Sequence, residues 1–162
     1  MKRFVFVVFL LFATLSYAQN NSLLKKGNLP VHVKADKFEA FNKKGLYIFY
    51  GNVVVERDGA TLKADKIEIF KNKDYKDVSK IICTGHVVIT KNDKEARADK
   101  AIYEIKDKRI ILKGNAIVTS NKNEMSSNVI VYYIDKDYAV SQSFDSKKQV
   151  EVTIYPDIKE KK

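Results

Sequence analysis

The residues of this chain that could support chemistry are two histidines, one cysteine and a periodic set of aspartates. His32 and His86 could act as general bases, and Cys83 could act as a nucleophile if a base lay within reach. Neither histidine lies in a spacing typical of a catalytic or metal-binding motif, and the sequence has no phosphate-binding glycine loop and no nucleophile elbow. We therefore expect no enzymatic activity, no resident metal and no cofactor.

Cys83 has the sequence context of a core residue. It stands two residues before Gly85, where the equivalent positions of neighbouring segments hold Phe49 and Leu112. Free cysteine is among the most buried residue types, so we predict a small buried hydrophobe here. A single cysteine also excludes an intrachain disulfide.

The aspartates belong to a repeated unit, which favours a structural turn over a reactive site. Markers of the unit recur about every 28 to 34 residues, a spacing typical of stacked supersecondary units. The first half of the unit is marked by Ala35-Asp36-Lys37, Ala64-Asp65-Lys66 and Ala98-Asp99-Lys100, with Ser126-Ser127-Asn128 as a degenerate fourth copy. The second half is marked by Gly51-Asn52, Gly85-His86 and Gly114-Asn115. His86 stands where the other copies have asparagine, which indicates a polar role at a strand entry.

The elements that must position these markers are strands. From Pro30 onward apolar and polar residues alternate with a period of two, and no stretch beyond the N-terminus has the pattern of an amphipathic helix. We predict an all-β, antiparallel fold of roughly 12–16 short strands. Alternation places one apolar stripe along the stack, and in the fourth copy it assigns Val129, Val131 and Tyr133 to that stripe. The stripe could be a closed core or the lining of a groove.

The two ends of the chain differ from this repeated region. Residues 1–18 have the pattern of a secretory signal peptide, with Lys2 and Arg3 before an apolar stretch and Ser16-Tyr17-Ala18 as a cleavage site before Gln19. The apolar stretch is about 12 residues, shorter than the roughly 20 of a spanning helix. We expect a flexible N-terminus at 19–29, a β-domain at 30–143, and a charged, partly disordered segment at 144–162 with one more strand near 150–155.

The composition is basic. Removing Lys2 and Arg3 from the formal net charge of +10 leaves +8 on the mature chain. An excess of this size suggests an acidic partner such as phosphorylated lipid, nucleic acid or a membrane surface, although a solvated lysine-rich sheet would have the same composition. Secretion and the lack of a basic motif interleaved with aromatic residues argue against nucleic acid.

Four segments resemble the LptA/OstA family of periplasmic lipopolysaccharide-transport proteins. They are 30–36 (PVHVKAD), 50–55 (YGNVVV), 62–66 (LKADK) and 112–118 (LKGNAIV), and the similarity extends over roughly residues 30 to 143. The resemblance implies a slightly open, twisted β-jellyroll with an apolar interior. It also implies head-to-tail homo-oligomers that bridge an inner-membrane LptC-like protein and an outer-membrane LptD-like translocon, located in the periplasm.

The same resemblance implies a lipid-binding groove that holds the lipid A acyl chains of lipopolysaccharide. Transferred to this chain by parity, the lipid-binding residues are Val31, Val33, Phe49, Val53, Val55, Val87, Ile89, Tyr103, Ile105, Ile110, Leu112, Val118, Val131 and Tyr133. Two alternatives remain open. One is an LptC-like partner of the same fold that keeps its N-terminal membrane anchor, and the other is a periplasmic structural β-repeat protein without lipid cargo.

Overall fold

The computed structural model describes residues 31–72, 74, 77–136, 138–143 and 149–155. The predicted signal peptide and the predicted flexible segment 19–29 lie outside these residues. The described elements are the strands β1 (His32–Lys34), β2 (Lys37–Phe41), β3 (Leu46–Arg57), β4 (Ala60–Lys71), β5 (Val78–Lys91), β6 (Lys94–Glu104), β7 (Arg109–Ser120), β8 (Asn123–Tyr133), β9 (Tyr138–Gln142) and β10 (Glu151–Thr153), with one 3-10 turn, η2 (Asn42–Lys44).

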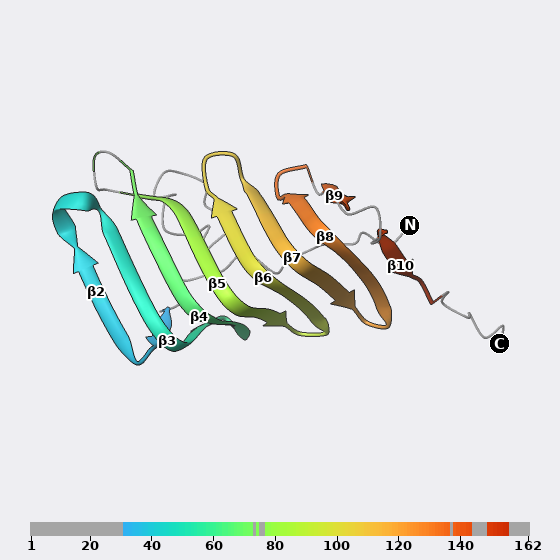
Figure 1. Ribbon diagram of the computed structural model, residues 1–162, viewed down its shortest axis with the longest axis horizontal. Coiled ribbons are helices and arrows are strands. Elements are labelled where there is room, and N and C mark those ends of the chain that lie inside the picture. Colours follow the sequence, from blue (N-terminus) through green and yellow to red (C-terminus); the bar gives the residue numbers. More distant parts are fainter. Residues whose placement is uncertain (1–30, 73, 75–76, 137, 144–148, 156–162) are drawn as a thin grey trace, which may run out of the picture.

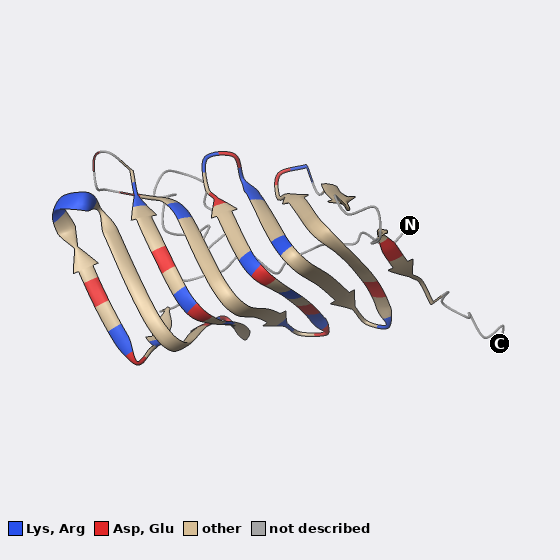
Figure 2. Ribbon diagram, in the orientation of Figure 1, with Lys and Arg blue, Asp and Glu red and all other residues tan. Residues whose placement is uncertain are grey.

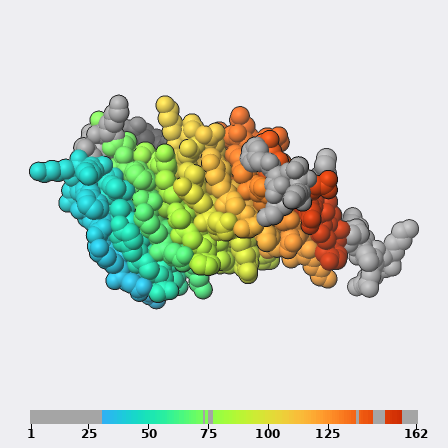
Figure 3. All heavy atoms as spheres, viewed as in Figure 1, coloured from blue at the N-terminus to red at the C-terminus, as the bar shows by residue number. Residues whose placement is uncertain are grey.

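The strands form one antiparallel sheet whose order follows the chain (Figure 1). Strands β3 to β8 are a meander in which each strand pairs with the next one. At one end β1 and β2 both pair with β3, and at the other end β9 and β10 both pair with β8. The molecule is therefore elongated, and successive segments occupy successive bands along its long axis in Figure 3. The predicted all-β antiparallel fold is confirmed.

The sheet has fewer and longer strands than the sequence predicts. Ten strands are described where the pattern suggests roughly 12–16. The glycines inside the strands mark bulges, and pairing resumes after each one; β3 and β4, for example, shift register between Tyr50 and Val53 and then pair again.

Each of these bulges is built from an aspartate, a glycine and an asparagine or histidine, an arrangement that we call a bend latch. The three bend latches are Asp36/Gly51/Asn52, Asp65/Gly85/His86 and Asp99/Gly114/Asn115. In each, the aspartate Oδ2 accepts a hydrogen bond from the polar side chain, at 2.9 Å from Asn52 Nδ2, 2.8 Å from His86 Nδ1 and 3.0 Å from Asn115 Nδ2. His86 therefore replaces an asparagine in a structural role, as predicted.

Only glycine fits the central position of a bend latch. Gly85 has a φ of +78°, in the left-handed region that L side chains rarely adopt. A Cβ added to Gly85 would lie 2.1 Å from Asp65 Oδ2. The following residue, His86, also has a positive φ, of 44°. The glycine and the asparagine of the other two bend latches have a similar pair of positive φ values, so all three bend latches interrupt the extended backbone in the same way.

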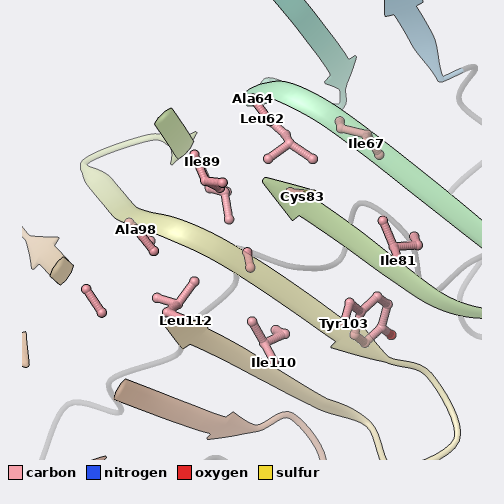
Figure 4. Packing of buried hydrophobic residues seen from close by; sticks show 14 of the residues in the cluster. Leu62, Ala64, Ile67, Ile81, Cys83, Ile89, Ala98, Tyr103, Ile110 and Leu112 are labelled. Atoms are coloured by element: carbon pink, nitrogen blue, oxygen red, sulfur yellow. The ribbon is translucent and has the colours of Figure 1, made fainter. Parts of the chain in front are cut away.

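The bends place apolar residues from both halves of each strand on one side of the sheet, which we call the inner face; the other side is the outer face. On β4, Leu62 and Ile67 lie on opposite sides of the bulge, and each is 1% exposed. Residues from several strands form one buried cluster (Figure 4). Since the described strands form a single sheet, this burial requires the two halves of the bent sheet to cover each other.

Candidate functional site

The inner face is the candidate functional site, and it collects most of the predicted lipid-binding residues. Eight of them belong to the buried cluster: Val53, Val55, Val87, Ile89, Tyr103, Ile110, Leu112 and Val118. Phe49 and Ile105 are half-buried and pack against that cluster. Figure 4 shows Tyr103, Ile110 and Leu112 among the side chains that pack together in this buried cluster.

Val31 and Val33 lie at the edge of the sheet. Both are 37% exposed, and Val33 is the cross-strand partner of the buried Val55. Cross-strand partners project from the same face of a sheet, so Val33 continues the inner face out to the β1 edge. The apolar surface therefore extends from the buried cluster to the exposed edge of the sheet at β1.

The parity predicted for the fourth repeat is wrong. Val131 pairs with Ile111 on the outer face, and Tyr133 follows it on that same face. The inner-face residues of β8 are Ile130 and Tyr132, which are 3% and 9% exposed. The degenerate marker Ser126-Ser127-Asn128 can be aligned with the Ala-Asp-Lys marker in two ways. The predicted parity follows from the alignment in which Ser126 occupies the position of the alanine.

The structure resolves this choice through the pairing of β7 with β8. Ser127, not Ser126, is the partner of the buried Ala116 and is itself buried. Ile130 then follows Ser127 by three residues, as Ile67 follows Ala64 in the second repeat. This three-residue step across the bulge was the signal that could have identified Ile130 and Tyr132.

Both ends of the sheet expose apolar side chains. At the β1/β2 end, Phe38 is 53% exposed, and its ring lies 4.7 Å from that of Phe49 between centroids. At the β9/β10 end, Tyr138 and Val152 are more than half exposed, and Val152 pairs with Met125, which packs against the buried cluster. Edge strands that combine unpaired backbone groups with exposed apolar residues are templates for pairing with another chain.

Two titratable side chains of the inner face, Cys83 and Tyr103, have raised pKa values. Burial of Cys83 raises the pKa of its thiol to about 12, so the thiol stays protonated at neutral pH, as expected of a core residue. Burial also raises the pKa of Tyr103. Among the residues that the structure describes, no group of three or more His, Cys, Asp or Glu side chains could hold a metal ion.

The outer face carries ion pairs between neighbouring positions. Glu39 raises the pKa of Lys37 through a hydrogen bond and its charge, and Lys37 in turn lowers the pKa of Glu39. Glu104 raises the pKa of Arg109 in the same way. None of these residues contributes to the inner face, so charge is confined to the surface and the interior stays apolar.

Within the described part of the chain, no helix is long and apolar enough to span a membrane.

The strand order and the apolar inner face together define an antiparallel β-jellyroll built from one open sheet. The family model described as "LptA/(LptD N-terminal domain) LPS transport protein" matches residues 32–138. The chain belongs to this family of lipopolysaccharide transport proteins, as the sequence motifs indicate.

Structural comparison agrees on the fold. The chain is similar to the crystal structure of LptH from Pseudomonas aeruginosa, described as the LptA homologous periplasmic component of the conserved lipopolysaccharide transport device. The TM-score is 0.66 at 19% sequence identity, over 78% of this chain and 96% of LptH. No curated protein matches the sequence.

Proposed function

We propose that this protein carries lipopolysaccharide across the periplasm, from an inner-membrane complex to an outer-membrane translocon. The lipid A acyl chains would lie against the inner face, while sugars and phosphates stay in water. Membership of a lipopolysaccharide transport family supports this proposal. The observation that carries it is the inner face itself, an apolar surface that continues from Val33 at one edge to Val152 at the other.

Lipid can occupy the inner face only if the two halves of the sheet separate. Val53, Leu62 and Val87 are each 1% exposed, so side chains already fill the interior. Separation would expose apolar area at about 25 cal/mol per Å², and an acyl chain that covers the same area would offset that cost. We infer that the interior is closed without cargo and opens as an acyl chain enters.

The exposed edges are suited to pairing with further copies of the fold. We propose that the β1/β2 edge of one copy pairs with the β9/β10 edge of the next, in a head-to-tail contact that extends the inner face. An LptC-like protein would occupy the free edge at the inner membrane, and an LptD-like translocon the free edge at the outer membrane. In this proposal a signal peptide is cleaved before Gln19, 19–29 is a flexible N-terminus, 30–143 is the jellyroll domain, and 144–162 is a charged segment that contributes β10 to the sheet.

Photo-crosslinking in intact cells tests the lipid path. A photoreactive side chain replaces Ile105, which is half-buried and packs against the buried cluster of the inner face. The matched control replaces Ile117, another half-buried isoleucine, whose cross-strand partners Arg97 and Ser126 place it on the outer face. We expect lipopolysaccharide adducts at Ile105 and none at Ile117. Equal yields at both positions, or none at either in an exported and folded protein, would contradict the proposal.

The near-complete burial of the interior supports one other candidate, a structural β-repeat protein with a closed core. Such a protein would give no adduct at Ile105 and would purify without lipid. The anchored LptC-like alternative differs at the N-terminus, outside the described residues. Intact mass of the protein extracted from the envelope separates the two forms, because the proposed carrier begins at Gln19 and an anchored protein keeps its apolar segment.

A further inference from the structure

A row of cations crosses the outer face beside the bend latches. Lys37, Lys66 and Lys100 follow the three aspartates of the latches, and the strand register places them in one line across the sheet. In the first two repeats a glutamate two residues further along pairs with the lysine. The Nζ–Oε1 distances are 2.6 Å for Lys37 and Glu39, and 3.0 Å for Lys66 and Glu68. Figure 2 shows these blue and red bands together on β2 and β4.

The third repeat departs from this self-neutralising pattern. Ile102 stands where the first two repeats have glutamate, so the acid that would pair with Lys100 is missing. Strand β7 then places Lys113 directly opposite Lys100 in the register. Like charges in directly opposed positions destabilise a sheet, since their Cβ atoms lie about 4.5 to 5.5 Å apart. Among the described residues, neither lysine has an ion-pair partner.

The surroundings of the two lysines add a hydroxyl and an apolar surface. Thr84 is the partner of Lys100 on the other side, which makes its exposed hydroxyl the next group in the row. Ile102 and Ile111 form the next cross-strand pair on this face, and both are half-buried. The nearest acid in sequence, Asp99, accepts a hydrogen bond from Asn115 within its bend latch.

Two ammonium groups without an ion-pair partner, next to two half-buried aliphatic side chains on the same face, complement an anion that is attached to an apolar body. We propose that Lys100 and Lys113 form a binding site on the outer face for the phosphate group of an anionic membrane phospholipid, with Ile102 and Ile111 against its apolar portion. The site lies on the opposite side of the sheet from the proposed lipopolysaccharide path. It would let the carrier rest against a membrane surface without using its interior.

Vesicle binding by the mature chain tests this site. The probe is phosphatidylcholine vesicles that contain phosphatidylglycerol, and the test variant is K100Q/K113Q. The control variant is K34Q/K63Q, which loses the same charge from two outer-face lysines that flank Val54 and, within the described residues, have no ion-pair partner. Each lysine near an anionic membrane surface strengthens binding by about fivefold. We therefore expect the test variant to bind about 30-fold more weakly, or about 2 kcal/mol, and the control to change by less than about threefold.

Other outcomes would overturn the proposal. Equal losses in the two variants would mean diffuse attraction of a basic protein, and no loss in either would mean that these lysines do not contact the membrane. Inorganic phosphate that displaces the protein from vesicles at micromolar concentration would indicate a site for the free anion.

K113E is the folding control, because it places an acid opposite Lys100. We expect K113E to unfold at a higher urea midpoint than the parent protein and to lose vesicle binding. Since no vesicle contains lipopolysaccharide, failure here would leave the Ile105 crosslinking result unaffected.

Discussion

Substitution of Gly85 by alanine should reveal how strongly a bend latch holds the sheet. The new Cβ would lie 2.1 Å from Asp65 Oδ2, a distance that real Cβ contacts do not show, so Asp65 must move away. Alanine at the φ of +78° costs about 1–2 kcal/mol by itself. Displacing Asp65 also breaks its hydrogen bond with His86, which is worth about 0.5–1.5 kcal/mol. We expect G85A to lower the free energy of unfolding by about 2–3 kcal/mol.

Gly59 provides the matched control for this substitution. It has a similar φ, +71°, but nothing lies within 4 Å of the Cβ that alanine would add. G59A should therefore cost only the backbone strain of about 1–2 kcal/mol. Urea unfolding followed by circular dichroism measures the free energy of unfolding of both variants. If that free energy falls with urea concentration at the same slope in both, their unfolded states are comparable.

The difference between the two variants is the quantity that tests the latch. We expect G85A to be less stable than G59A by about 1 kcal/mol, and D65A to relieve part of that excess when combined with G85A. Relief is only partial because Asp65 Cβ would still lie 2.9 Å from the new methyl group. Equal urea midpoints for G85A and G59A would refute the argument that the aspartate side chain makes glycine necessary.

Two further predictions concern residues of the sheet interior and the bends. H86N should leave the free energy of unfolding within about 0.5 kcal/mol of the parent in urea titrations, because Asn52 and Asn115 make the same hydrogen bond in the other latches; a loss as large as that of G85A would contradict this equivalence. Cys83 should not react with a thiol reagent at pH 8 in the folded protein and should react in urea, since its pKa is raised from 9.0 to about 12. Because the folded pKa is the higher one, Cys83 should favour the folded state below pH 9 and disfavour it progressively as pH rises toward 12, a trend that C83A should lack.

The sequence predicts the inner face well wherever the repeat is intact. In the second and third repeats, the alternation around Asp65 and Asp99 assigns Ile67 and Tyr103 to the face on which the structure buries them. Local alternation suffices there because the Ala-Asp-Lys marker fixes which residue precedes the bulge. In the fourth repeat either Ser126 or Ser127 fits the pattern, and only pairing with Ala116 on β7 decides between them. A one-residue shift then moves every following side chain to the other face.

The number of strands was harder to predict for a related reason. A glycine in a strand is consistent with a turn, a break or a bulge, and the outcome depends on whether hydrogen bonding resumes beyond it. At Gly114 it does resume, because Lys100 pairs with Lys113 before the bulge and Arg97 with Ile117 after it. Pairing depends on both strands, so the alternation of apolar and polar residues within one strand does not predict it.

The bend latches also bear on how an apolar interior could open. The backbone hydrogen bonds of this sheet join neighbouring strands within each half, whereas the two halves meet through apolar side chains such as Leu62 and Ile67. Separating the halves about the line of latches therefore breaks apolar contacts and leaves the strand ladders intact. An acyl chain that enters replaces those contacts with others of the same kind, at a similar free energy per unit of buried area. A sheet bent at the latches is thus compatible with reversible loading, because the strand ladders keep their hydrogen bonds while the interior exchanges one apolar surface for another.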